Sequence, residues 1–321
     1  MKVGLVGFGF IGQVHYKAYD RLSEVDVVAV VEPGPNAQMV PEGVPVFDDV
    51  KDMFSTLDLD IVDICLPTHI HASCIQDACM WGKHVICEKP LARTVEEARQ
   101  VIDDCELAGV ELYVAHVLRF FPEYGAIRQA IADGEIGRPR VVEAKRLSSL
   151  PLQSVDNWLH KHTMSGGAIL DLAIHEFDFL RWILGEVDSV FCQSIHNRVR
   201  HEICVATLKF ASGAVALVEA GWGLPEGSPF TTSIDIAGTD GLLTYDSNES
   251  QPLALLLPYH MDYKPAPSVE PYVAELSHFM RCIKGEEKPI CTANDGLEAV
   301  KIASAAIRSA ESGRAERLVS E

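Results

Sequence analysis

The segment Gly7-Phe8-Gly9-Phe10-Ile11-Gly12 decides the fold of the first part of this chain. It has the spacing G-x-G-x-x-G, follows an apolar strand-like run and opens a helix-like stretch. In this setting Gly7 permits a tight turn, Gly9 lets the backbone approach a pyrophosphate, and Gly12 allows the helix to pack closely on the strand. The new helix also presents unpaired N–H groups to phosphate oxygens. The segment therefore predicts a dinucleotide-binding βαβ unit.

An acidic residue, Glu32, stands 20 residues after Gly12 at the end of the apolar run Val27–Val31. A carboxylate at this place accepts hydrogen bonds from the ribose hydroxyls of adenosine, and it repels a 2′-phosphate. No Lys or Arg between Pro33 and Gly43 would attract such a phosphate. These residues favour NAD(H) over NADP(H) as the cofactor. The alternative is a structural glycine turn beside a surface glutamate.

The order of strand-like and helix-like segments predicts two domains. In the first third, apolar runs alternate with amphipathic stretches, which indicates βαβ units and a parallel sheet. From about Arg119 onward strands crowd together, and short turns indicate a largely antiparallel sheet. We therefore expect an α/β fold with an N-terminal Rossmann domain (residues 1–118) and a C-terminal α+β domain (residues 119–321) with a mostly antiparallel open sheet. In the second domain we expect helices at Glu123–Asp133, Ala168–Leu184, Val269–Ile283 and Asn294–Ser312, and a polar loop over Ser148–Gly167.

The composition narrows the class of protein and its partners. Hydrophobic residues make up 48% and charged residues 23% of the 321 residues, as in ordinary globular chains. The net charge of −19 disfavours nucleic acid and anionic membranes as partners. No apolar stretch approaches the roughly 20 residues that span a bilayer, and the start does not resemble a secretory signal. The nine cysteines form no C-x-x-C pair and fit reduced thiols, so we expect a cytoplasmic protein.

Two further segments carry candidate catalytic residues. Lys89 follows the strand-like run His84–Cys87 and can point into the crevice at the carboxyl ends of the strands. Asp171, His175 and Asp178 fall at positions i, i+4 and i+7 of an expected helix and share one stripe. A carboxylate one turn from an imidazole can orient it as a base that takes a hydroxyl proton while hydride leaves. A surface lysine in a turn and an ordinary ion pair on a helix surface remain open as alternatives.

Two pairs of histidines, His69 with His71 and His160 with His162, have the spacing H-x-H. Such a pair can share a metal ion, but neither has a cysteine or carboxylate at a convincing ligand spacing. We therefore expect no metal site. Trp158 and His160 instead lie in the loop that leads to the expected catalytic helix, so they are candidates for the border of a substrate pocket.

Several motifs together make the chain resemble the Gfo/Idh/MocA oxidoreductase family. The combination of an E-K-P segment with D-x-x-x-H is specific to this family, whereas the glycine pattern is not. Phe121 replaces a frequent Asn and Ser165 replaces the first glycine of a triple, and both departures concern what is bound. The matching segments are the glycine segment, Leu66-Pro67-Thr68-His69-Ile70-His71, Gly82-Lys83-His84-Val85-Ile86-Cys87-Glu88-Lys89-Pro90-Leu91-Ala92, Arg119-Phe120-Phe121-Pro122, Gly134-Glu135-Ile136-Gly137, and Ser165-Gly166-Gly167 leading into Asp171-x-x-x-His175.

The resemblance implies site residues in both domains. Lys89, Asp171 and His175 would be catalytic, with His175 or Lys89 as the proton acceptor and Asp171 orienting His175. With the positions argued above, the candidate cofactor-binding residues are Gly7, Gly9, Phe10, Ile11, Gly12, Glu32, Pro67, Thr68, His71, Glu88 and Lys89. The candidate substrate residues are Arg119, Trp158, His160 and His175.

The resemblance also implies an activity and an assembly. The expected function is NAD(H)-dependent transfer of hydride between nicotinamide and a secondary alcohol or ketone of a sugar, polyol or related small molecule. The family's assemblies imply a homo-oligomer, a dimer or tetramer. Two alternatives remain: an NAD-binding regulator that has lost turnover, and an enzyme that cleaves glycosides with the help of NAD.

Overall fold

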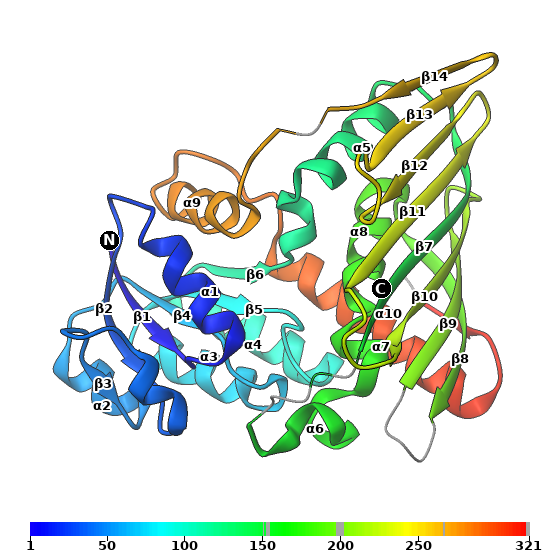
Figure 1. The fold of residues 1–321 in the computed structure, drawn as a ribbon. Helices are drawn as coiled ribbons and strands as arrows, with labels where there is room; N and C mark the ends of the chain where they lie inside the picture. The colour runs from blue at the N-terminus through cyan, green and yellow to red at the C-terminus, as the bar shows by residue number, and fades with distance from the viewer. Residues whose placement is uncertain (150, 152–154, 197–201, 266, 319–321) are drawn as a thin grey trace.

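The computed structural model describes residues 1–149, 151, 155–196, 202–265 and 267–318. The chain forms two β-sheets with different strand orders, and helices lie between and around them (Figure 1). No helix in the described parts of the chain is both long and apolar enough to cross a membrane.

The N-terminal sheet has six parallel strands in the order β3-β2-β1-β4-β5-β6. The strand order reverses between β1 and β4, and ligands of doubly wound folds bind outside the carboxyl ends of the strands at this point. The expected Rossmann fold is thereby confirmed. Its strands are β1 (Lys2–Val6), β2 (Asp26–Val31), β3 (Val46–Phe47), β4 (Ile61–Ile64), β5 (His84–Glu88) and β6 (Leu112–Ala115), and its helices are α1 (Phe10–Tyr19), α2 (Val50–Thr56), α3 (His71–Met80) and α4 (Val95–Ala108).

Local sequence sets the ends of α4. The Thr94 side chain accepts a hydrogen bond from the Glu97 backbone N–H, and the Glu97 carboxylate accepts one from the Thr94 N–H. This reciprocal arrangement satisfies two of the unpaired donors at the helix start. The helix ends at Gly109, which adopts the left-handed conformation at φ +68°.

The second sheet has nine strands in the order β14-β13-β12-β11-β7-β10-β9-β8-β15. Only the β7–β10 pair among the described strands of this sheet is parallel, so the mostly antiparallel open sheet is also confirmed. Its strands are β7 (Pro139–Ser149), β8 (Val187–His196), β9 (Glu202–Phe210), β10 (Val215–Leu224), β11 (Thr231–Gly238), β12 (Leu242–Asp246), β13 (Leu253–Leu257), β14 (His260–Tyr263) and β15 (Glu316–Arg317).

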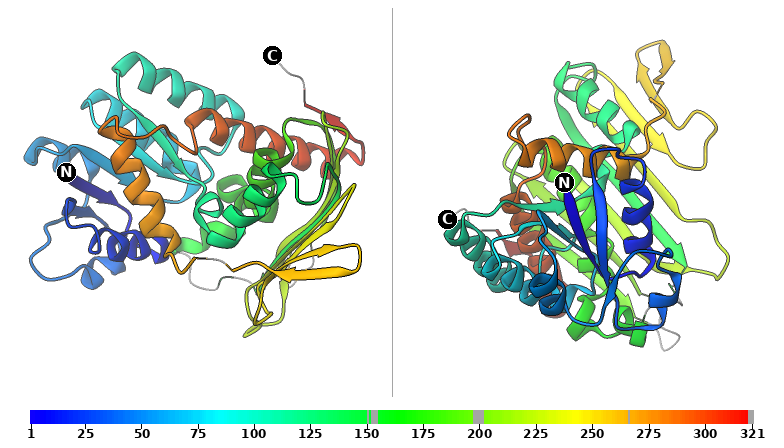
Figure 2. Two further views of the ribbon diagram at one scale, coloured as in Figure 1. Left: turned by 90° about the horizontal axis from the view of Figure 1, so that it is seen from above. Right: turned by 90° about the vertical axis from the view of Figure 1, so that its left-hand side faces the viewer.

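Helices cover the inner face of the second sheet and connect it to the first. Figures 1 and 2 show α8 and α10 on the side of this sheet that faces the N-terminal domain, while none of the described helices lies on its outer side. Helix α10 contacts both β8 of the second sheet and β6 of the first. The helices of this part are α5 (Pro122–Ala132), α6 (His162–Ser165), α7 (Gly167–Asp171), α8 (Ile174–Leu184), α9 (Pro271–Ile283) and α10 (Ala293–Ser312).

The chain returns to the N-terminal sheet near its end. Helix α9 packs beside α1, and its buried Leu276 and Phe279 join an apolar cluster with Val3, Ile61 and Ile86 of the parallel sheet. Residues far along the chain therefore complete the core of the first sheet. The domain boundary at 118/119 remains a prediction.

The structure corrects two expected elements. The single helix Ala168–Leu184 is wrong, because α7 ends at Asp171 and α8 begins at Ile174, with turn residues between them. The expected loop Ser148–Gly167 instead includes the end of β7, the 3-10 helix η4 (Val155–His160) and α6. Residues 150 and 152–154 of that loop lie outside the described residues.

Candidate active site

The glycine segment forms a tight turn at the start of α1. Gly7 has φ +94°, and a Cβ atom there would lie 2.5 Å from the Cys65 carbonyl oxygen. A Cβ atom at Gly12 would lie 2.1 Å from the Gly7 carbonyl oxygen, whereas at Gly9 it would meet nothing within 4 Å. No side chain caps α1 at Gly9, so the first N–H groups of the helix remain for a ligand. This open, uncapped turn fits a dinucleotide pyrophosphate.

The Glu32 side chain links this glycine turn to the end of β2 through hydrogen bonds. Its Oε2 atom accepts a hydrogen bond of 2.8 Å from the Phe8 N–H, and its Oε1 atom accepts one of 2.9 Å from the Gly34 N–H. Each carboxylate oxygen has a second lone pair, so both can still accept from a ribose hydroxyl. Glu32 thus holds the glycine turn in addition to its expected part in cofactor binding.

The loop after β4 holds the next expected cofactor residues. Pro67 and buried Thr68 begin the 3-10 helix η2 (Thr68–Ile70), which leads into α3. His71 is 1% exposed, with Nδ1 2.8 Å from the Pro90 carbonyl oxygen and Nε2 2.7 Å from that of Leu66. Both ring nitrogens of His71 therefore face backbone, which favours positioning of two loops over contact with a cofactor.

Lys89 lies at the carboxyl end of β5, followed by a cis peptide bond to Pro90. Its Nζ atom donates a hydrogen bond of 2.8 Å to the Asp171 carbonyl oxygen and lies 3.6 Å from Asp171 Oδ1. An ammonium group has three N–H donors, so this arrangement leaves donors for a bound ligand. The two side chains are 14% and 18% exposed, which places them at the edge of the packed interior.

Asp171 does not orient His175 as the single-helix expectation required. The break between α7 and α8 directs Asp171 to Lys89, and no hydrogen bond or ion pair joins Asp171 to His175 among the described interactions. The Nδ1 atom of His175 is buried without a partner in the described structure. Burial, followed by the charges of Lys89 and Arg146, holds the pKa of His175 well below its usual value, so its ring is neutral at pH 7.

His116 is a further candidate site residue, which sequence reasoning missed. It follows β6, and the pairing of Glu88 with Ala115 places it beside Lys89 in the sheet. It is 1% exposed, its Nδ1 atom lies 3.7 Å from Asp178 Oδ2, and burial lowers its pKa. It follows a strand at the sheet edge where ligands of such folds bind, and this position could have identified it.

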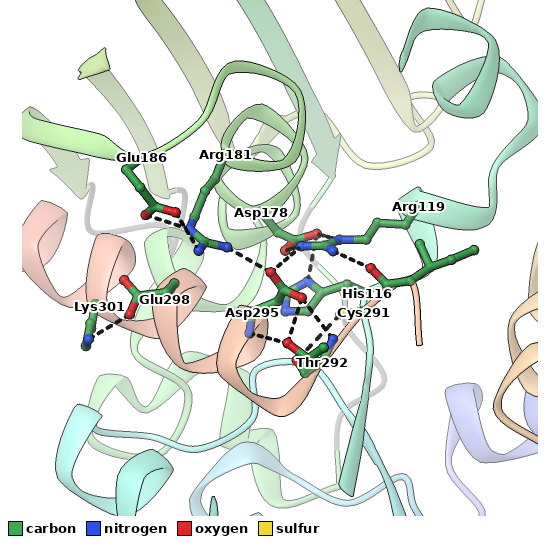
Figure 3. Close-up of polar contacts among 11 residues, drawn as sticks. His116, Arg119, Asp178, Arg181, Glu186, Cys291, Thr292, Asp295, Glu298 and Lys301 are labelled. Carbon is green, nitrogen blue, oxygen red and sulfur yellow. Dashed lines mark hydrogen bonds and ion pairs between the residues drawn. The ribbon is translucent and has the colours of Figure 1, made fainter. Parts of the chain in front are cut away.

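Arg119, a candidate substrate residue, forms a buried ion pair with Asp178 (Figure 3). Arg119 Nε and Nη2 donate hydrogen bonds of 2.9 and 2.6 Å to the two Asp178 oxygens, and Nη1 donates one of 2.7 Å to the Ile290 carbonyl. Arg181 and Arg119 both approach Asp295, 2.8 and 3.4 Å away. Burial alone would raise the pKa of Asp295, but the charge of Arg119 and the hydrogen bonds that the Asp295 carboxylate accepts lower this pKa to about 2. Arg119 therefore joins the segment after β6 to α8 and α10.

The expected pocket residues Trp158 and His160 lie in η4 and are partly buried. The next helix, α6, contacts both η4 and η2 of the loop after β4. Arg93, shortly after Lys89, donates a hydrogen bond of 2.9 Å to the His162 carbonyl oxygen. The η4–α6 segment thus lies against both loops of the candidate site.

A buried cluster of polar side chains is hydrogen-bonded to the backbone of the candidate site. His15 is fully buried, with Nδ1 2.8 Å from Asp63 Oδ2 and Nε2 3.1 Å from Glu88 Oε1. An imidazole between two carboxylates must donate from both nitrogens and is therefore a cation. Burial opposes that charge, yet Asp63 holds the pKa of His15 well above its usual value. The second Glu88 oxygen accepts a hydrogen bond of 3.1 Å from the Lys89 N–H, so the cluster positions the Lys89 backbone.

This cluster also gathers residue types that bind metals. One ligand atom each from His15, Asp63 and Cys65 lie within 4.8 Å of one another, but His15 already uses Nδ1 on Asp63. Neither H-x-H pair belongs to this group. Two signals could have found the cluster: an aspartate inside the apolar run of β4, and a histidine three residues after Gly12 on the same helix face.

Two sequence profiles together match most of the chain. One, described as an oxidoreductase family with an NAD-binding Rossmann fold, matches residues 1–116, and the other, described as the GFO/IDH/MocA C-terminal domain, matches residues 124–244. The chain belongs to the Gfo/Idh/MocA oxidoreductase family. This finding confirms the resemblance that the motifs indicate, and with it an NAD-dependent oxidoreductase.

Relatives of this Gfo/Idh/MocA protein include named dehydrogenases. It is 28% identical to inositol 2-dehydrogenase of Rhizobium meliloti (strain 1021) over 331 residues, which cover 96% of each chain. It is 27% identical to scyllo-inositol 2-dehydrogenase (NAD(+)) of Bacillus subtilis (strain 168), with 98% of this chain and 95% of that one covered. Its fold is similar to the crystal structure of the WlbA dehydrogenase from Bordetella pertussis in complex with NADH and UDP-GlcNAcA, with a TM-score of 0.89, 24% identity, and 100% and 98% of the two chains covered.

Proposed function

We propose that this protein is a dehydrogenase that oxidises a secondary alcohol of a sugar, an inositol or another polyol, or reduces the matching ketone. The observation that carries the proposal is the position of Lys89 at the carboxyl end of β5, where it contacts Asp171 and its charge acts on buried His175. The names of the inositol dehydrogenases support the substrate class. A polyol offers many hydroxyls, which suits a site lined with ammonium, imidazole and carboxylate groups.

The chemistry divides between cofactor and side chains. Bound NAD supplies the hydride acceptor. Lys89 Nζ, held by the Asp171 carbonyl oxygen, donates a hydrogen bond to the reacting oxygen and stabilises charge on it as its proton leaves. His175 accepts that proton at Nε2, because Nδ1 is shut away from solvent. Gly9, Glu32 and the Pro67–Thr68 loop hold the cofactor, while Trp158 and His160 border the substrate.

An absorbance screen for NADH tests this function directly. We would mix the protein with NAD and a panel of inositols, linear polyols and aldoses, and measure NAD binding separately by calorimetry. Accumulating NADH with one class of substrate supports the proposal. Release of an aglycone from glycosides without net NADH would replace it with cofactor-assisted glycoside cleavage. Tight NAD binding without turnover on any panel member would replace it with a regulator.

The lowered pKa of His175 predicts the pH dependence of the reaction. A base that stays neutral below the ordinary histidine value of 6.5 remains able to accept a proton there, so activity should persist as the pH falls past 6.5. The folded protein also binds a proton at His175 less readily than the unfolded chain does. The contribution of His175 to the free energy of unfolding is therefore present above pH 6.5 and is lost as the pH falls. The measurement is kcat/KM against pH for wild type and His175→Asn. An acid limb above 6.5, or one unchanged in the variant, contradicts this assignment.

We also propose that the outer face of the second sheet mediates self-association. Val141, Ile195, Val205, Val215 and Leu217 on β7 to β10 are between 39% and 74% exposed there. The described helices lie on the opposite face (Figure 2), and an apolar sheet face without a covering layer is typical of an interface. Sedimentation equilibrium should show a dimer or tetramer that Leu217→Glu dissociates. A wild-type monomer at micromolar concentration would rule this out.

The state of the cysteines supports a cytoplasmic location, which remains part of the proposal. All nine cysteines lie among the described residues and carry free thiols. Reduced thiols of this kind are typical of reducing compartments.

A further inference from the structure

One pair of cysteines differs from the others in its geometry. Cys79, in the last turn of α3, and Cys105, on α4, have their Sγ atoms 3.2 Å apart. A disulfide has its sulfur atoms about 2.05 Å apart, so the two atoms need to approach by only about 1 Å. A hydrogen bond of 2.9 Å between Gln76 Nε2 and Asp104 Oδ2 holds the same two helices together beside this pair.

Access and acidity favour Cys79 as the reactive member. It alone among the nine cysteines is partly exposed, while Cys105 is 2% exposed. The hydrogen bond between the two thiols lowers the pKa of Cys79, although partial burial and Asp104 act in the other direction. The same contact and burial raise the pKa of Cys105. An accessible thiol that ionises readily beside a buried second thiol is typical of reversible oxidation sites.

The remaining cysteines lack this combination. Burial raises the pKa of Cys74 to about 12, and that of Cys282 to about 11. Cys192 and Cys204 lie on neighbouring strands and contact each other, but both are 0% exposed. A small oxidant in solvent therefore reaches Cys79 before any of these thiols.

We propose that Cys79 and Cys105 form a redox modification site, in which a peroxide converts the two thiols into a reversible disulfide between α3 and α4. The Cys79 thiolate attacks one oxygen of hydrogen peroxide, the O–O bond breaks, and a sulfenic acid and hydroxide form. The Cys105 sulfur then attacks the sulfenic sulfur of Cys79, and the S–S bond forms as the S–O bond breaks. The hydroxyl group leaves with the proton of the Cys105 thiol as water. Two thiols lose two electrons in all, and one peroxide becomes two waters.

The experiment uses the full chain, starting fully reduced. The protein is treated with hydrogen peroxide and then denatured, so that N-ethylmaleimide blocks buried as well as exposed unreacted thiols. The products are identified by intact mass and peptide mapping. We expect the loss of two hydrogen atoms, about 2 Da, a single cross-linked peptide that contains Cys79 and Cys105, and full reversal by dithiothreitol. The other seven cysteines should all carry the blocking group.

Variants separate this site from general oxidation. Cys79→Ser should abolish the cross-link and leave Cys105 as a thiol, whereas Cys105→Ser should leave a sulfenic acid on Cys79 that dimedone traps. Cys192→Ser is the matched control from the buried pair and should leave the cross-link unchanged. The proposal is overturned if wild type keeps all nine thiols, if the cross-link joins another pair or two chains, or if Cys79 passes to sulfinic acid while Cys105 stays reduced.

Discussion

Lys89→Ala is expected to lower kcat about 10²–10⁴-fold, the usual range for loss of a group that assists proton transfer. In the structure Nζ is held 2.8 Å from the Asp171 carbonyl oxygen at the carboxyl end of β5, ready to donate to a reacting oxygen. Alanine removes that donor and its charge, and no other lysine shares the hydrogen bond to Asp171 among the described residues. The measurement is steady-state NADH formation at saturating NAD, beside calorimetric binding of NAD.

Lys83→Ala is the matched control for Lys89→Ala. Lys83 precedes β5, at the opposite end from Lys89, where its Nζ atom donates to the Leu59 carbonyl oxygen. It should leave kcat unchanged. If Lys89→Ala weakens NAD binding but keeps kcat at saturating NAD, Lys89 binds the cofactor and takes no part in proton transfer.

Arg119→Ala is expected to lower the free energy of unfolding by about 3–5 kcal/mol, because it leaves a buried carboxylate without its partner. Arg119 and Asp178 are each 1% exposed at their side chains, and the guanidinium meets both carboxylate oxygens (Figure 3). Denaturant unfolding measures the loss. Arg119→Ala combined with Asp178→Leu should recover part of it, since no unpaired charge then remains.

Arg128→Ala is the control for an arginine near the same helix. Arg128 is exposed and lies 4.3 Å over the Trp182 ring, so its removal should cost only about 0.5–1 kcal/mol. Comparing the two variants also separates an effect on stability from an effect on substrate binding. A large rise in KM for Arg119→Ala with unchanged stability would return Arg119 to the substrate site, where the sequence motif places it.

Most of the fold could be predicted because apolar periodicity reports burial directly. The run Val27–Val31 is entirely apolar, and Ile61–Leu66 contains only one charged residue, Asp63, as expected for strands covered on both sides. The break between α7 and α8 escaped prediction because Leu172 and Ala173 are good helix formers and neither is Gly or Pro. Tertiary contacts, such as that of Lys89 with Asp171, accompany the break where local propensity favours a continuous helix.

The candidate site was only partly predictable, since its partners come from distant segments. The motifs identified Lys89 and His175, whose roles remain proposals. Spacing along one helix assigned Asp178 to the catalytic stripe, whereas its ion-pair partner Arg119 is 59 residues away in sequence. His15 was missed for the same reason, because its carboxylate partners lie on β4 and β5. Which distant residues form such pairs depends on the topology of the fold. The pattern of residues within one helix or strand does not contain this information.

The return of α9 to the N-terminal sheet affects how the chain is made. Leu276 and Phe279 cover Val3, Ile61 and Ile86, yet they are translated about 160 residues after the last strand of that sheet. At roughly 5–20 residues per second the delay is on the order of 10–30 s. During this time the growing polypeptide carries an uncovered apolar surface at the ribosome. We therefore expect the N-terminal domain to be prone to aggregation until α9 has been made.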